Sequence, residues 1–336
     1  MTSPKTEYTY YIRKKWFTLF FLVAALCAVT LISLSIGSSR LPFMEIFRVL
    51  TGGGEVASRT IIFNVRFPRI ATGIAAGFAL ALAGCIMQNV LRNPLASAST
   101  LGVAQGASFG AAIAIVYFQA GVVIFAFLGG ITSTIFILLI ARISGVTPAA
   151  MILVGVALSA MFTGGTTLVQ YFADDMRIAS IVYWTFGNLG RAGWSEITLI
   201  FIVSTIALVY FLFNRWNYNA MEGGTHTAKS LGVNVDMLIL ISMTVATLIS
   251  AVAIAFVGTI NFIGLIAPHI VRKFVGNDYR FLIPCSAIMG AVIMLGADIA
   301  ARMIAAPAIL PIGALTSFLG APMFLYILIK RGRALA

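Results

Sequence analysis

Two stretches of the chain decide its fold: Trp16–Gly37, WFTLFFLVAALCAVTLISLSIG, and Pro148–Ala173, PAAMILVGVALSAMFTGGTTLVQYFA. Neither contains a charged side chain, and each exceeds the length of about twenty apolar residues that an α-helix needs to cross a bilayer core. Of the 336 residues, 60% are hydrophobic and only 10% are charged. A water-soluble chain rarely keeps such runs, because its surface needs charged residues throughout. The sequence therefore predicts a polytopic membrane protein.

The apolar runs predict an all-α membrane protein of about ten transmembrane helices, which form a single domain over residues 1–336. The third predicted span contains Gln105 and several glycines, and the eighth is short and contains Pro268. Both are included because the basic residues then fall consistently relative to the membrane. The predicted spans are 16–37, 69–91, 97–118, 121–141, 148–170, 195–213, 237–258, 260–271, 281–301 and 311–329.

The lysines predict the orientation of the chain in the cell membrane. With both termini in the cytoplasm, all six lysines lie on the cytoplasmic side, as the positive-inside rule requires. The formal net charge of +12 then reflects topology and attraction to anionic lipid. We therefore expect lipid as a partner and no nucleic acid. The polar external stretch 41–50 has helical spacing and predicts a short interfacial helix.

Several kinds of site have no support in the sequence. Cys27, Cys85 and Cys285 are far apart and form no C-x-x-C pair, and His226 and His269 are the only histidines, so no metal site or disulfide framework is indicated. The glycines at 52–54 are not followed by Gly-Lys-Ser or Gly-Lys-Thr, so no P-loop is present. No nucleophile–base pair supports an enzyme. We expect no cofactor in this chain.

Small residues and interrupted segments suggest how the helices pack. Gly102, Gly106 and Gly110 form one stripe, and Ala75, Ala79 and Ala83 form another. Such stripes let membrane helices approach closely, and the same faces can also permit tilting during transport. The Pro-interrupted segments 92–96 and 264–269 lie at corresponding places in the two halves. Short or broken spans in both halves are typical of an inverted-repeat transporter.

Ionisable side chains are almost absent from the predicted spans. Asp298 precedes Arg302 by four residues, so the two share one helical face and can form an ion pair near the end of the ninth span. Ion-coupled carriers usually place a carboxylate or histidine near the membrane midplane. The sequence offers poor support for such a coupling group, although a self-sufficient secondary transporter remains the alternative function.

The cytoplasmic loop around residues 222–235 is the most informative loop. Thr225–Leu231 predicts a short helix ended by Gly232, a natural C-cap residue. Ala228 and Leu231 would give this helix an apolar edge that could dock a partner. An ordinary surface turn is the alternative.

A set of ordered motifs resembles the permeases of siderophore, haem and vitamin B12 ABC importers, the FecCD/BtuC-like family. The motifs extend over about residues 60–330, and no single one is decisive, but their order is highly specific. They are Arg66-Phe-Pro-Arg69, Ala-Gly at 76–77 and 83–84, Met87-Gln88, Arg92-Asn-Pro-Leu-Ala96, Leu101-Gly102, Ala228-Lys-Ser-Leu-Gly232, Asn261-Phe-Ile-Gly-Leu-Ile-Ala-Pro-His-Ile-Val-Arg272, Gly296-Ala-Asp-Ile-Ala-Ala-Arg302 and Gly320-Ala-Pro-Met-Phe324.

The resemblance implies a non-catalytic subunit of a type II ABC importer. It implies a second permease copy or a close paralogue, two ATPase subunits that hold ATP and Mg²⁺, and an extracytoplasmic substrate-binding protein. The cargo would be a metal chelate, with iron-siderophore as the first expectation and haem, cobalamin or an oxyanion as others. The sequence does not name the substrate, because the binding protein is expected to do most of the selection.

The resemblance also implies roles for particular residues. The ATPase-coupling loop would contain Thr225, Ala228, Lys229, Leu231 and Gly232. The outward arginines Arg66, Arg69 and Arg302 would pair with acidic residues of the binding protein, since arginine offers a donor fork for carboxylates. The cytoplasmic gate would contain Asn93, Leu95, Ser144 and Thr147. One departure is Ile309-Leu310-Pro311, where many members have Glu at the first position.

Overall fold

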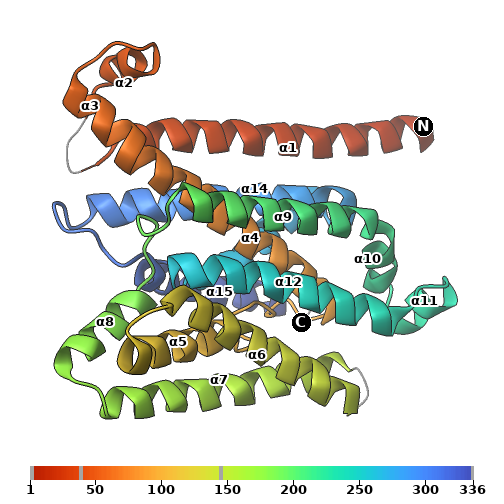
Figure 1. The fold of residues 1–336 in the computed structure, drawn as a ribbon. Helices are drawn as coiled ribbons and strands as arrows, with labels where there is room; N and C mark the ends of the chain where they lie inside the picture. Colours follow the sequence, from red (N-terminus) through yellow and green to blue (C-terminus); the bar gives the residue numbers. More distant parts are fainter. Residues whose placement is uncertain (1–3, 38–40, 144–146, 334–336) are drawn as a thin grey trace.

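The computed structural model describes residues 4–37, 41–143 and 147–333. The described residues form helices and connecting loops, with no β-strand among them. Figure 1 shows their arrangement. The helices are α1 (Pro4–Ser35), α2 (Phe43–Leu50), α3 (Val56–Thr60), η1 (Ile61–Arg66), α4 (Phe67–Val90), α5 (Val103–Ile113), η2 (Ala114–Phe118), α6 (Val122–Ile143), α7 (Pro148–Tyr171), α8 (Asp175–Thr185), α9 (Trp194–Phe213), α10 (Arg215–Glu222), α11 (Thr225–Ser230), α12 (Val235–Val257), α13 (Ile263–Val275), α14 (Tyr279–Met303) and α15 (Ile312–Arg333).

The ten predicted spans each have a helical counterpart, which confirms the all-α membrane architecture. Seven helices in the described chain are long and apolar enough to cross a bilayer. One of them, Val56–Val90, joins α3, η1 and α4 and starts well before the predicted boundary at residue 69. The ten counterparts are α1, α4, α5 with η2, α6, α7, α9, α12, α13, α14 and α15.

Two short helices each follow a break in the chain. The backbone leaves helical geometry at Arg92, where φ is 47°, and α5 begins only at Val103. The second break covers residues 258–262 and ends at Phe262, where φ is 67°. The prediction of an interruption at 264–269 is wrong, because α13 continues through Pro268. Proline has no N–H for the carbonyl four residues earlier, and the Gln88 side chain on α4 donates to that Gly264 carbonyl at 3.4 Å.

The packing of the helices agrees with a two-fold repeat of opposite orientation. α4 packs against α12, α13 and α14, and α12 packs against α4, α5 and α6. In Figure 1, α4 starts at the end that carries α3, whereas α12 starts at the opposite end, beside α11. Each of these long helices is followed by a break and a short helix, as expected for inverted transporter repeats.

Small residues allow the central helices to touch through their backbones. A Cβ at Gly84 on α4 would lie only 1.9 Å from the carbonyl oxygen of Gly264 on α13. A Cβ at Gly106 on α5 would lie 2.4 Å from the oxygen of Gly129 on α6. The predicted alanine stripe on α4 is fully buried: Ala75, Ala79 and Ala83. These stripes therefore serve close helix packing, which replaces the hydrophobic effect as the force that joins helices in lipid.

The two ends of the bundle carry different short helices. The start of α1 lies at the end that carries α10 and α11, here called the α11 end (Figure 1). The opposite end, here called the α2 end, carries α2, α3 and α8 (Figure 1). α2 corresponds to the interfacial helix predicted at 41–50. It buries Ile46 and Val49 and exposes Phe43, as an amphipathic surface helix does.

A buried ion pair ties α1 to the rest of the α11 end. Lys15 is only 1% exposed, and its Nζ donates to Asp278 Oδ2 at 3.0 Å. Arg280 binds the same oxygen through Nη2 at 2.7 Å. Burial opposes ionisation of Asp278, but the hydrogen bonds from Arg280 and Lys15 outweigh it and hold the pKa of Asp278 well below its usual range. The first helix is therefore anchored at the turn between α13 and α14.

Candidate functional site

A short helix, α11, stands between α10 and α12 at the α11 end. The N–H of Gly232 donates to the carbonyl of Lys229 at 3.0 Å, and the N–H of Val233 donates to that of Ala228 at 3.0 Å. This pair of bonds is a Schellman motif, which satisfies carbonyls at a helix end. Gly232 has a φ of 83°, a conformation that glycine adopts without a steric penalty. The helix therefore ends at Gly232, as the sequence predicts.

The two residues of the apolar edge predicted for α11 lie in different environments. Leu231 is 68% exposed and is free of the chain's core, whereas Ala228 is completely buried within it. The prediction that Ala228 forms part of an exposed edge is therefore wrong, because its methyl group anchors α11 to the bundle. Lys229 pairs with Asp236 at 3.7 Å, with both side chains more than half exposed, so this pair contributes little to stability. Thr225 is half-buried at the start of the helix.

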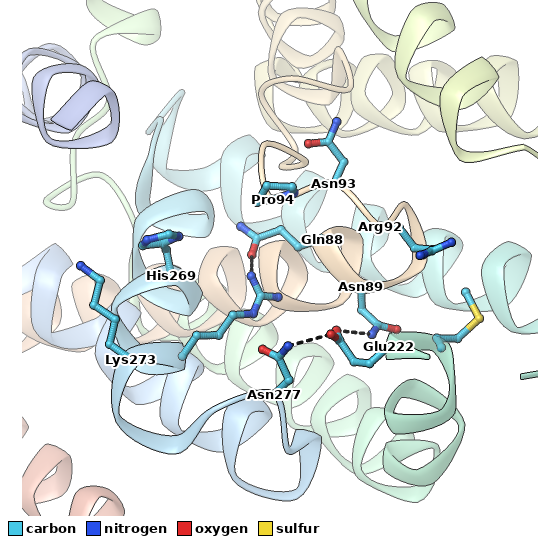
Figure 2. Close-up of a pocket in the computed structure, with 11 residues that line it drawn as sticks. Gln88, Asn89, Arg92, Asn93, Pro94, Glu222, His269, Lys273 and Asn277 are labelled. Carbon is cyan, nitrogen blue, oxygen red and sulfur yellow. Dashed lines mark hydrogen bonds between the residues drawn. The ribbon is translucent and has the colours of Figure 1, made fainter. Parts of the chain in front are cut away.

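Glu222, the last residue of α10, connects the base of α11 to three other parts of the chain. Its carboxylate accepts hydrogen bonds from Asn89 Nδ2 on α4 at 3.2 Å and from the Tyr279 hydroxyl on α14 at 3.0 Å. It also accepts one from Asn277 Nδ2 at 2.8 Å (Figure 2). One side chain thus ties the α10–α11 segment to α4 and to the turn before α14.

These groups border a cavity of about 460 Å³ at the α11 end, here called the inner pocket (Figure 2). Arg272 crosses its wall and donates to Gln88 Oε1 at 2.7 Å. Arg92 and Lys273 also line the pocket, and Glu222 is the one carboxylate among its lining residues. The inner pocket is therefore electropositive. Its lining residues are Gln88, Asn89, Arg92, Asn93, Pro94, Met221, Glu222, His269, Arg272, Lys273 and Asn277.

The residues predicted for a cytoplasmic gate lie at different places. Asn93 lines the inner pocket, and its Oδ1 accepts the N–H of Leu95 at 2.8 Å, which fixes the turn after α4. Leu95 is 37% exposed. Thr147 is the N-cap of α7, where its hydroxyl accepts the N–H of Ala150 at 3.3 Å. Ser144 lies outside the described residues. The gating role remains a prediction.

The three arginines predicted for docking gather at the α2 end around one carboxylate. Asp298 on α14 is fully buried. Arg69 on α4 binds its Oδ1 through Nε at 2.9 Å and through Nη2 at 2.8 Å. Arg302 approaches its Oδ2 through Nη2 at 3.0 Å, which confirms the predicted Asp298–Arg302 pair. Arg66 donates to the carbonyl of Leu34 at the end of α1.

The arginines are more enclosed than freely exposed donors would be. Arg66 is only 5% exposed, and the side chains of Arg69 and Arg302 are 12% and 7% exposed. They border a cavity of about 200 Å³, here called the arginine pocket, whose wall also contains Ile309. The expectation that these arginine side chains are exposed is therefore wrong for the chain in isolation. Their role in docking remains a prediction.

A third cavity, which the sequence analysis missed, is lined only by neutral residues. It has a volume of about 250 Å³ and is here called the hydroxyl pocket. The signal was present in α7, where four polar residues recur on one helical face of an otherwise apolar span. These residues are Thr163, Thr166, Thr167 and Gln170, and the rest of the lining is Ala104, Gln105, Ser108, Thr185, Thr259 and Asn261. The pocket offers hydroxyl and amide groups and no formal charge.

Residues that could hold a metal ion do not gather anywhere in the described parts of the chain, where no three His, Cys, Asp or Glu side chains form such a group. Cys27, Cys85 and Cys285 are free thiols, and the last two are buried.

Known proteins of similar sequence cover nearly the whole chain. Residues 25–330 match the FecCD transport family. The chain is 49% identical to a "Putative ABC transporter permease protein" of Methanocaldococcus jannaschii, with 96% of this chain and 97% of the relative aligned. It is 35% identical to the iron(3+)-hydroxamate import system permease protein FhuB of Bacillus subtilis, with 94% of this chain and 84% of the relative aligned.

A solved structure shares the arrangement of the helices. It is described as "An inward-facing conformation of a putative metal-chelate type ABC transporter", and it superposes with a TM-score of 0.84 at 31% sequence identity. The superposition covers 93% of this chain and 98% of that chain. The similarity therefore extends over the helical bundle as a whole.

Proposed function

Because this chain belongs to the FecCD transport family, we propose that it is the membrane-spanning permease of an ABC importer that moves a metal chelate into the cytoplasm. The observation that carries the proposal is α11 with its exposed Leu231, held to α4 and to the turn before α14 through Glu222. A partner that pushes on this helix therefore acts on helices that cross the membrane. The sequence has no P-loop, so ATP and Mg²⁺ belong to a separate ATPase subunit.

The positive-inside rule supports the orientation of this assembly. All six lysines of the sequence fall in segments assigned to the cytoplasm, including Lys15 in the first half of α1 and Lys229 on α11. The α11 end then faces the cytoplasm, with both chain termini, and the α2 end faces outward. The ATPase subunits dock at α11, and a substrate-binding protein docks over Arg66, Arg69 and Arg302. The permease acts as a homodimer or with a close paralogue.

The hydroxyl pocket supports a bulky, oxygen-rich cargo. Its hydroxyl and amide groups can exchange hydrogen bonds with a passing chelate. Because its lining has no formal charge, the pocket would not bind a charged chelate too tightly to release it. A metal held in a siderophore presents carbonyl and hydroxamate oxygens, and the Bacillus subtilis relative is named for iron(3+)-hydroxamate import. Iron-siderophore is therefore the proposed cargo, ahead of haem, cobalamin and oxyanions.

The cargo is tested with the ligand that the binding protein retains. The permease is purified with the ATPase and the binding protein encoded beside it, and the ligand that co-purifies with the binding protein is identified by mass spectrometry. ATP-driven uptake is then compared for ferric hydroxamate, haemin, cobalamin and molybdate. We expect ferric hydroxamate to be retained and accumulated. Retention and uptake of any other member of the panel would contradict the proposed cargo.

A further inference from the structure

The inner pocket gathers basic side chains from two parts of the chain at the α11 end. Arg92 follows the end of α4, and Arg272 and Lys273 belong to the last turn of α13. With His269 counted as neutral, three positive charges in the lining stand against the single negative charge of Glu222, which leaves an excess of two. This excess matches the charge of a phosphate group near neutral pH, about −1.5 to −2.

The one carboxylate of the lining is engaged by neutral groups. Glu222 accepts hydrogen bonds from two asparagine side chains and a tyrosine hydroxyl, as described above. Arg272 donates to Gln88 Oε1 at 2.7 Å, which is also a neutral group. Among the described side chains, Arg92, Arg272 and Lys273 form no ion pair with a carboxylate. The positive charge of the inner pocket is therefore available to an anion from outside the chain.

Arg92 occupies a backbone position that favours glycine. Its φ is 47°, and its N–H donates to the carbonyl of Asn89 at 2.9 Å. The N–H of Asn93 donates to the carbonyl of Gln88 at 3.1 Å, which completes a Schellman motif in which glycine is the usual residue at this place. Because arginine is strained where glycine is not, its side chain has a role beyond ending the helix. Arg92 Nη1 lies 3.9 Å from the place of a Cβ on Gly224, the N-cap of α11.

The size and place of the inner pocket suit a phosphate that belongs to a larger molecule as well as a free one. Its volume of about 460 Å³ falls within the range of about 300–1,000 Å³ that is typical of small-molecule sites. Figure 2 places Lys273 and Arg92 on opposite sides of the pocket, so a group bound between them contacts both α13 and the turn after α4. Basic pockets between transmembrane helices on the cytoplasmic side are typical sites for lipid phosphate head groups.

We infer that the inner pocket binds a phosphate group, which Arg92, Arg272 and Lys273 hold. Arginine presents a planar donor fork to two phosphate oxygens, and lysine adds a compact charge. Given the proposed orientation of the chain, the phosphate comes from the cytoplasm as the free ion or from the inner leaflet as a phosphatidic acid head group. From either source it joins α13 to the turn after α4, beside the base of α11.

The test is thermal unfolding of the purified permease in dodecyl maltoside, a detergent without phosphate. Sodium phosphate is compared with sodium chloride at equal ionic strength. Phosphatidic acid in mixed micelles is compared with diacylglycerol, which has the same chains and lacks the phosphate. A ligand that binds the folded state raises the melting temperature, so we expect a phosphate probe to raise it above its matched control. A response to sodium phosphate alone identifies the free ion as the ligand, and a response to phosphatidic acid at much lower concentration identifies the lipid. No response to either probe would overturn the inference.

Arg92→Gly and Lys273→Gln each remove one positive charge from the pocket, and Arg142→Gln is the matched control. Glycine suits the left-handed backbone at residue 92, and Lys273 is exposed, so both variants are expected to fold. Arg142 is exposed in the last turn of α6 and does not line the pocket. We expect the probe concentration that gives half of the stabilisation to rise at least about fivefold in the two pocket variants and to keep its wild-type value in the control. Equal responses of Lys273→Gln and Arg142→Gln would overturn the inference.

These measurements use the permease alone and require neither the ATPase nor transport. Failure of the wild type to import any chelate would refute the proposed function, whereas the phosphate response would still support the site in the inner pocket. ATP-driven import by a permease that shows no phosphate response would overturn this inference and leave the proposed function in place.

Discussion

Replacing Leu231 with alanine removes the apolar side chain that protrudes from α11. Leu231 is 68% exposed in the isolated chain, and a docked ATPase would cover that surface. Complete burial of a leucine side chain contributes about 1.5–3 kcal/mol, so covering this exposed share contributes about 1–2 kcal/mol. Alanine is therefore expected to raise the dissociation constant of the ATPase by about 5- to 30-fold. Aspartate is expected to weaken binding further, because the contact would then bury an unpaired charge.

The assay is titration of the purified ATPase onto the permease in nanodiscs. Leu50→Ala is the control, because Leu50 is 47% exposed on α2 at the opposite end of the bundle. It is expected to bind the ATPase like the wild type, and all variants are expected to keep the same melting temperature. Wild-type ATPase affinity for Leu231→Ala and Leu231→Asp would refute the assignment of α11 as the coupling helix.

Three further changes probe the elements around the two ends. Glu222→Gln removes the charge of the carboxylate that accepts three hydrogen bonds, so the free energy of unfolding is expected to fall by about 1–2 kcal/mol. Stimulation of the ATPase by the binding protein is expected to fall as well. Unchanged stimulation would contradict the role of Glu222 in connecting α11 to the bundle. Gly84→Ala places a Cβ 1.9 Å from the oxygen of Gly264, so denaturant titration is expected to show that the free energy of unfolding falls by about 1–3 kcal/mol. Gly296→Ala is the control, because nothing lies within 4 Å of its added Cβ, and it is expected to be nearly neutral. Equal effects of the two variants would contradict the close packing of α4 on α13. Asp278 has a lowered pKa in the folded state, so its stabilising contribution is complete above its unfolded pKa of about 3.9 and is lost as the pH falls through the folded value. Asp278→Asn is therefore expected to lower the melting temperature equally at pH 7 and pH 5. A loss of melting temperature that is present at pH 7 and absent at pH 5 would contradict this assignment.

Hydropathy predicted the spans well because the constraint is local. Backbone groups within the bilayer core must be hydrogen-bonded within the protein, and a long apolar run does this most simply as a continuous helix. The predicted span 195–213 differs from α9 by one residue at its start, and 148–170 differs from α7 by one residue at its end. The end of α11 was equally predictable, because Gly232 alone carries the information for that cap.

The failures concern contacts between residues far apart in the sequence. Nothing near Pro268 reveals that Gln88, on another helix, donates to the carbonyl that proline leaves without a donor. The enclosure of Arg69 depends on Asp298, which follows 229 residues later. The burial of Ala228 likewise depends on how the loop folds back onto the bundle. A sequence period shows which residues share a face, but it does not show what that face contacts.

Uptake into sealed vesicles tests the central claim most directly. The permease is reconstituted with its ATPase and binding protein, and accumulation of the chelate that the binding protein retains is followed with ATP supplied on the side that the α11 end faces. We predict that accumulation requires ATP, stops when the P-loop lysine of the ATPase is replaced, and persists when ionophores abolish all ion gradients. Accumulation by the permease alone, driven by an ion gradient without the ATPase, would contradict the account.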